Sequence, residues 1–241
     1  MRLAIYSLLL AVTAGFTFAQ SPAPKPKAKS KGNAIAAMAN PKAVDPKLPN
    51  VLILGDSISI GYTVAVRELL NGKANLFRPP TNCGPTTNGL KGIDAWIGDE
   101  KWDVIHFNWG LHDLKFVTDD PNKIVPVETP GAKWQVSLED YEKNLRTLVE
   151  RVKKTGAKLI WCTTTPVVVG TSGRKTEDVL KFNEAAARVM KELGVETDDL
   201  YAYALPKLAE IQLPTTVHYS PEGYKVLAQQ VAAVIEKALM K

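Results

Sequence analysis

The chain has 241 residues, which is enough for one sizeable domain and for two at most. Its formal net charge of +5 would suggest a nucleic-acid partner, but the basic residues are unevenly placed. Residues 1–48 hold seven of the 30 Lys and Arg residues and one of the 25 Asp and Glu residues, so this tail carries +6 and the other 193 residues carry −1. We therefore expect no nucleic-acid partner, and a tail suited to contact with an anionic envelope.

The N-terminal residues have the pattern of an export signal. An apolar run, Leu3–Phe18, follows a positively charged start and is shorter than the roughly 18 or more residues of a membrane span. Thr17 and Ala19 occupy the small-residue positions of a cleavage site. Residues 1–19 are thus predicted to be a signal peptide, which predicts a periplasmic or extracellular location; the alternative is an uncleaved anchor.

Residues 20–48 are rich in Pro, Ala and Lys and contain no aromatic residue. Such a composition buries too little apolar surface to offset the entropy of ordering. We expect a disordered linker here and a single domain over residues 49–241.

From residue 50 onward, short apolar runs alternate with amphipathic stretches, which is typical of an α/β fold with a parallel sheet covered by helices. One helix is expected directly after Gly55–Ser59, and another begins at a Ser220 cap with Pro221 in its first turn. The other expected helices are 138–154 and 179–193, and the expected strands are 51–54, 74–77, 104–109, 158–163 and 195–200.

The connection over residues 114–137 breaks this alternation. It contains three prolines and has no clear period, and long connections of this kind are usually functional rims or disordered. Because it follows a strand end, we expect a rim over the site. Trp134 either caps that rim or, as the plainer account, anchors the loop to the core.

Ser57 is the first candidate for chemistry. It follows the first expected strand and opens a helix, where unpaired backbone N–H groups can hold a developing oxyanion. The same position suits an ordinary helix N-cap, and this segment alone does not separate the two interpretations.

His218 is the second candidate, in a loop just before the last expected helix. The positive end of a helix dipole favours a neutral imidazole, which is what a general base needs at neutral pH. The chain has only three histidines. His106 lies inside an expected strand, where a hydrogen-bonded core role is the plainer interpretation.

Four segments, in order along residues 50–241, resemble the blocks of the SGNH (GDSL-like) hydrolase family. They are GDSIS at 55–59, NCGPTT at 82–87, NWGLHD at 108–113 and VHYSPEGY at 217–224. The resemblance implies a three-layer α/β/α, flavodoxin-like fold with a five-stranded parallel sheet in the order 2-1-3-4-5. In such sheets ligands bind where the strand order reverses, and the first and third blocks meet at that point.

The resemblance also implies the roles of individual residues. Ser57 is the expected nucleophile and His218 the expected general base. The backbone N–H groups of Ser57 and Gly84, with the His112 side chain, are expected to form the oxyanion hole. Asp56 and Asp113 are expected to structure their loops.

Two positions depart from the family pattern. His112 stands where the family has an oxyanion-donating asparagine, and a neutral imidazole can still donate one N–H. Thr215 stands where the family has the aspartate that orients the histidine. The expected arrangement is therefore a Ser–His dyad, with the imidazole held by a backbone carbonyl or by the Thr215 hydroxyl.

The implied activity is hydrolysis of ester bonds without a cofactor. We expect the substrate to be an O-acetylated carbohydrate; a short-chain ester or lysophospholipid hydrolase, and a non-catalytic glycan-binding protein on the same fold, are the alternatives. Few histidines and no clustered carboxylates give little support for a metal site. Cys83 and Cys162 form either one disulfide or two buried thiols.

Overall fold

A computed structural model describes residues 39–41 and 43–240. Its centre is a five-stranded parallel sheet in the order β2-β1-β3-β6-β7, which confirms the expected fold class and strand order. The strands are β1 (Asn50–Leu54), β2 (Asn75–Phe77), β3 (Val104–Phe107), β6 (Lys158–Cys162) and β7 (Glu196–Asp198).

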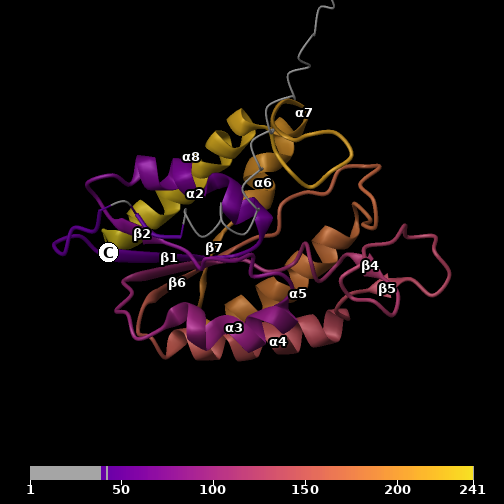
Figure 1. The fold of residues 1–241 in the computed structure, drawn as a ribbon, viewed down its shortest axis with the longest axis horizontal. Coiled ribbons are helices and arrows are strands. Elements are labelled where there is room, and N and C mark those ends of the chain that lie inside the picture. Colours follow the sequence, from indigo (N-terminus) through magenta and orange to yellow (C-terminus); the bar gives the residue numbers. More distant parts are fainter. Residues whose placement is uncertain (1–38, 42, 241) are drawn as a thin grey trace, which may run out of the picture.

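Helices cover both faces of the sheet and make three layers (Figure 1). On one face α2 packs against α8, and on the other α4 packs between α3 and α5. These helices are α2 (Ser57–Leu69), α3 (Thr86–Ile97), α4 (Leu138–Lys153), α5 (Asp178–Leu193) and α8 (Pro221–Leu239). Three short helical pieces precede α8: α6 (Leu200–Ala204), η1 (Leu205–Lys207) and α7 (Leu208–Ile211).

The central strands are largely apolar because each of their faces is covered. Four residues of β1, Val51–Leu54, and all four of β3 are buried, which is typical of a parallel sheet between two helix layers. His106 is the polar exception in β3 and is fully buried.

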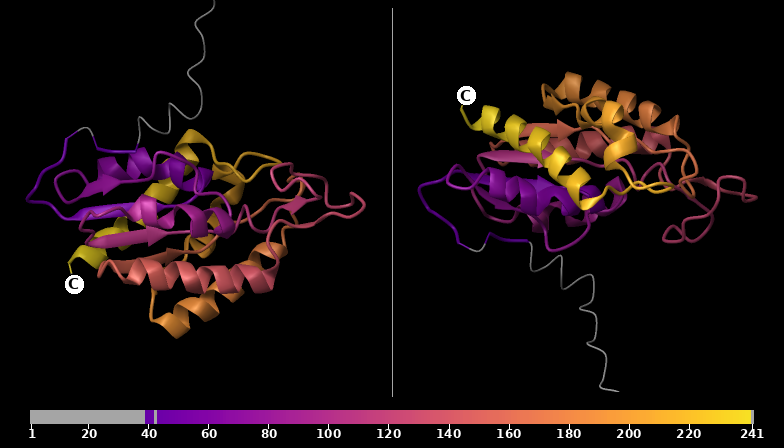
Figure 2. Two further views of the ribbon diagram at one scale, coloured as in Figure 1. Left: turned by 60° about the horizontal axis from the view of Figure 1, so that its bottom comes forward. Right: turned by 90° about the horizontal axis from the view of Figure 1, so that it is seen from above.

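The connection over residues 114–137 forms a small lobe with its own two-stranded antiparallel sheet, β4 (Phe116–Val117) and β5 (Lys133–Trp134). This lobe extends past one end of the main sheet (Figure 2). The Trp134 ring lies against Phe182 of α5, and its Nε1 donates to Asp178 Oδ2 at 2.8 Å. Trp134 thus anchors the lobe to the main body.

The folded domain begins before residue 49, so the expected linker boundary is wrong at its end. Ala39 is buried, and its carbonyl accepts from the Arg78 N–H at 2.9 Å. Asp45 and Asn75 exchange two hydrogen bonds, of 2.9 and 2.8 Å. Residues 1–38, including the expected signal peptide, lie outside the described residues. Among the helices of residues 39–41 and 43–240, none has the length and apolar character that a membrane crossing requires.

Candidate active site

Ser57 is the first residue of α2, just beyond the carboxyl end of β1. Its N-cap is Asp56, whose buried side chain accepts from the Ile58 N–H at 2.9 Å. Because Asp56 supplies the cap, the Ser57 hydroxyl is not needed for it. Asp56 therefore structures this turn, as expected, and the N-cap interpretation of Ser57 is wrong.

The Ser57 hydroxyl and the His218 imidazole come together from opposite ends of the chain. Ser57 Oγ lies 2.9 Å from His218 Nε2. This is the distance at which an imidazole takes a hydroxyl proton. The packing of α2 against α8 brings the pair together, since Ser57 begins α2 and the His218 loop leads into α8.

Backbone pairing on both sides fixes the His218 loop. The Leu213 N–H donates to the His218 carbonyl at 3.0 Å, and the Ser220 N–H donates to the Ile211 carbonyl at 2.9 Å. At Gly223 a Cβ atom would lie 2.2 Å from that Ile211 carbonyl oxygen. Glycine at 223 therefore permits the close approach that holds His218 in place.

The second ring nitrogen of His218 meets Thr216, not Thr215. His218 Nδ1 lies 3.1 Å from the Thr216 hydroxyl. Thr215 is exposed and has a positive φ of 56°, so the chain turns its side chain toward solvent. The expectation that Thr215 orients the imidazole is therefore wrong by one residue. In the tautomer that a general base at Nε2 requires, Nδ1 carries the proton and donates it to the Thr216 hydroxyl.

Gly84 has the left-handed backbone expected of a tight turn, with a φ of 61°. Its N–H, an expected oxyanion donor, points to the side-chain oxygen of Asn82 at 2.9 Å. An oxyanion can use this N–H only by displacing or sharing with Asn82. The neighbouring sequence gave no sign of that bond.

His112 lies in the loop that follows β3, and it is partly buried. Burial lowers its pKa below the ordinary value of 6.5; the positive charges of Lys115, Arg174 and His218 lower it further, while Asp56 opposes them. A neutral His112 ring keeps one N–H to donate, which is the form that the expected oxyanion role requires.

Asp113 joins the loop that carries His112 to the start of α3. Its Oδ1 accepts from the Thr86 N–H at 2.8 Å and from the Thr86 hydroxyl at 2.6 Å. Burial raises the pKa of Asp113 to about 7, and the Thr86 hydrogen bonds only partly oppose this. Asp113 therefore structures its loop, as expected, and links the segments of Gly84 and His112.

His106 lies in the core and is fully buried. Its Nε2 lies 3.0 Å from Asp198 Oδ2, both side chains are fully buried, and Gln230 Nε2 donates to Asp198 Oδ1 at 3.0 Å. Cys162 offers a third atom of metal-ligand type within 4.8 Å of these two. The His106–Asp198 hydrogen bond already engages two of the three groups, which fits a polar link between β3 and β7.

The two cysteines are separate buried thiols, so the disulfide alternative is wrong. Burial raises the pKa of Cys83 to about 12 and that of Cys162 well above its ordinary value. Neither thiol is therefore suited to be a nucleophile.

A serine–histidine pair at the carboxyl edge of a doubly wound sheet defines a class of hydrolases that form acyl intermediates on serine. Within that class, residues 53–226 match the model of the GDSL-like lipase/acylhydrolase family. The match covers well over half of the chain, so the chain belongs to this family, whose members hydrolyse ester bonds. No functionally curated protein matches it.

Solved structures share the fold at low sequence identity. A lipase/acylhydrolase from Enterococcus faecalis is 18% identical, with a TM-score of 0.64 over 79% of this chain and 96% of that one. The acetyl xylan esterase AlAXEase is 16% identical, with a TM-score of 0.61 over 77% and 99%. An acetylxylan esterase from Geobacillus stearothermophilus is 18% identical, with a TM-score of 0.60 over 78% and 93%.

Proposed function

We propose that this protein is an exported serine esterase that removes O-acetyl groups from carbohydrate, with Ser57 as nucleophile and His218 as general base. The observation that carries the proposal is the 2.9 Å contact between Ser57 Oγ and His218 Nε2 at the N-terminus of α2. The family membership gives ester hydrolysis, and the contact between the two side chains supports Ser57 and His218 as the residues that perform it.

In the first half of the reaction, His218 Nε2 takes the hydroxyl proton as Ser57 Oγ attacks the ester carbonyl. The tetrahedral intermediate collapses when the imidazolium returns this proton to the leaving sugar oxygen, which leaves an acetyl group on Ser57. His218 then takes a proton from water as the water oxygen attacks the acetyl carbonyl, and the imidazolium returns this proton to Ser57 Oγ as acetic acid leaves. The acid then loses its own proton to solvent as acetate.

The oxyanion needs donors that are aimed at the attacked carbonyl. The Ser57 N–H lies in the first turn of α2, where helix N–H groups have no partner within the helix. The neutral His112 ring adds a side-chain donor, and the Gly84 N–H adds a third once Asn82 yields it. Each such donor is typically worth about 10²- to 10³-fold in rate.

One comparison favours an acetyl group on a sugar. Two of the structural neighbours are named as acetylxylan esterases.

The test is hydrolysis of acetylated oligosaccharides and of nitrophenyl acetate by the purified full-chain protein. Ser57→Ala should abolish turnover and labelling by a fluorophosphonate, whereas Ser172→Ala, at an exposed serine, should leave both unchanged. Hydrolysis of long-chain or lysophospholipid esters in preference to acetyl esters would assign the alternative substrate class. Absence of both turnover and labelling would leave a glycan-binding protein as the working hypothesis.

Export is tested separately by the N-terminus of the protein recovered from outside the cytoplasm. A mature chain that starts directly after Ala19 is expected. Recovery of the whole chain in the membrane fraction would support the anchor instead.

A further inference from the structure

Arg174 is held next to the loop of His112 by a hydrogen bond to a segment that is far away in sequence. Its Nε donates to the Leu111 carbonyl at 2.9 Å, one residue before His112. The neighbouring Gly173 carbonyl accepts from the Phe116 N–H at 2.8 Å. At Gly173, which has a φ of 62°, a Cβ atom would lie 2.6 Å from the Val125 carbonyl oxygen, so only glycine lets the two segments approach this closely.

Within the described part of the chain, no carboxylate forms an ion pair with Arg174 or with Lys115. Three other arginines, at 146, 151 and 188, each meet an Asp or Glu side chain within 4.0 Å. Arg78, which is also buried, instead donates to the backbone carbonyls of Pro79 and Thr81. Lys115 is only 8% exposed and Arg174 is partly buried, so neither cation is fully solvated. A cation that is withdrawn from water without a carboxylate partner is costly, and such groups concentrate at functional sites.

The two cations lie within electrostatic reach of each other and of His112, the residue after the Leu111 carbonyl that Arg174 contacts. Burial lowers the pKa of Arg174 to about 10, and burial together with the charge of Arg174 lowers the pKa of Lys115. The charges of both cations lower the pKa of His112, and so does that of His218. The acids within electrostatic reach are Asp56, near Arg174, and Asp113 and Asp120, near Lys115.

We propose that Arg174, assisted by Lys115, forms an anion-binding subsite beside Ser57 and His218, and that the substrate is an acetylated acidic glycan. This inference rests on the proposed esterase function and names the substrate class for it. Because Nε is held by Leu111, the two terminal amino groups of the guanidinium remain for the ligand. That planar pair matches two oxygens of a carboxylate or a sulfate.

A neutral glycan would fit these observations less well. Its hydroxyl groups could accept hydrogen bonds from Arg174, but they would not neutralise the positive charge of Arg174 and Lys115. The anion could be the carboxylate of a uronic acid or a sulfate ester on a neighbouring sugar. Both have the chemistry that the guanidinium recognises, and the assay must separate them.

The experiment compares acetyl esters that differ in charge. The substrates are nitrophenyl acetate, acetylated neutral xylo-oligosaccharides, acetylated galacturonan oligosaccharides and an acetylated, sulfated galactan oligosaccharide. Arg174→Gln should lower kcat/KM on the preferred acidic substrate by about 10- to 100-fold, the usual range for a hydrogen-bonded charge. Hydrolysis of nitrophenyl acetate should change by less than about twofold, since that ester has no anion to bind.

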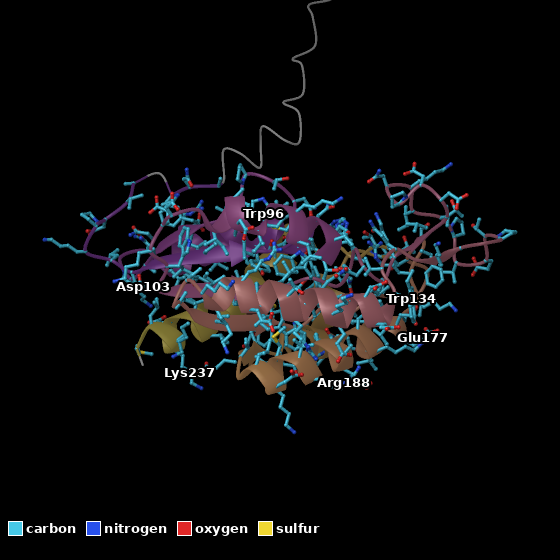
Figure 3. The ribbon with its side chains drawn as sticks, turned by 90° about the horizontal axis from the view of Figure 1, so that it is seen from below. Trp96, Asp103, Trp134, Glu177, Arg188 and Lys237 are labelled. Atoms are coloured by element: carbon cyan, nitrogen blue, oxygen red, sulfur yellow. The ribbon has the colours of Figure 1, made fainter. Side chains whose placement is uncertain are left out.

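Three matched variants guard against a merely structural effect. Arg188→Gln removes an exposed arginine of α5 (Figure 3) that pairs with Glu142 of α4, and it should leave kcat/KM on every substrate unchanged. Arg174→Lys keeps the charge without the planar fork and should lose less than Arg174→Gln. Lys115→Gln should weaken acidic substrates selectively, and the melting temperature of each variant reports folding.

The outcomes separate this inference from the proposed function. Two results would overturn the subsite and leave the esterase function in place. One is that neutral and acidic glycan esters are hydrolysed equally well. The other is that Arg174→Gln slows the hydrolysis of all substrates, nitrophenyl acetate included, to the same extent. If no ester is hydrolysed, binding of galacturonan oligosaccharide to the full chain is measured by calorimetry. Binding that Arg174→Gln weakens at least tenfold would support the subsite, and binding that it leaves unchanged would overturn it.

Discussion

The contact between Thr216 and His218 predicts how activity depends on a single hydroxyl group. Replacing Thr216 by Val keeps the shape of the side chain and removes the oxygen that lies 3.1 Å from His218 Nδ1. Without that acceptor the imidazole loses one restraint on its tautomer and its orientation. The matched control is Thr215→Val, at the neighbouring exposed position.

The size of the effect follows from the chemistry of the acceptor. A neutral hydrogen bond contributes about 0.5–1.5 kcal/mol net, and about 1.4 kcal/mol corresponds to a tenfold change in rate. Thr216→Val should therefore lower kcat by about 2- to 12-fold. Loss of an orienting aspartate in a complete triad lowers kcat by about 10⁴-fold. Removing a neutral hydroxyl at Nδ1 is therefore expected to lower kcat far less.

The assay is initial-rate hydrolysis of nitrophenyl acetate at neutral pH, with kcat and KM determined for both threonine variants. Thr215→Val should stay within about twofold of the unchanged protein. A larger loss in Thr215→Val than in Thr216→Val would refute the orientation seen in the structure. So would a loss of 10³-fold or more in Thr216→Val, because a neutral hydrogen bond cannot supply it.

Three further predictions concern other parts of the site. His112→Ala should lower kcat about 10²- to 10³-fold by removing an oxyanion donor, and His112→Asn should retain more activity than alanine in the same assay. Asp113→Asn should gain about 2–3 kcal/mol of stability relative to the unchanged protein between pH 5 and 8, measured by urea unfolding. The reason is that the pKa of Asp113 in the folded protein is about 7, above its ordinary 3.8, so the unchanged protein loses stability as the pH rises from 5 to 8 and the Asn variant does not. A difference in stability between the two proteins that stays constant over this pH range would contradict the prediction. Cys83 and Cys162 should not react with a disulfide reagent until the protein unfolds, and fast reaction of either would contradict their burial.

The architecture could be predicted because each main-sheet strand is a short, distinct run. The runs around Leu52, Ile105 and Ile160 are buried on both faces, so their sequences are apolar except for His106 and the terminal Asn50 and Lys158. Their ends agree with the structure to within one or two residues. The short β4–β5 pairing could not be predicted this way. It has two residues in each strand and depends on the contact of Trp134 with α5, which no local pattern encodes.

Site residues could be predicted where a sequence motif identifies them. They were missed where their position depends on a backbone conformation or on a segment that is distant in sequence. Ser57 and His218 were singled out by the resemblance of their segments to the family blocks, and the structure brings their side chains together. Thr215 and Thr216 are the same residue type, and only the positive φ of Thr215 shows which hydroxyl reaches the imidazole. Arg174 is 62 residues from His112 in an unremarkable loop, so its place beside the site depends on the fold.

An anionic substrate held at Arg174 would act close to the oxyanion donor proposed at His112. Burial lowers the pKa of His112, and the positive charges of Lys115 and Arg174 lower it further, so its ring is neutral and keeps one N–H to donate. The Arg174 Nε donates to the carbonyl of Leu111, the residue before His112. On this reasoning the proposed subsite would act on kcat as well as on KM, because an anion bound at Arg174 would position the segment that carries this donor.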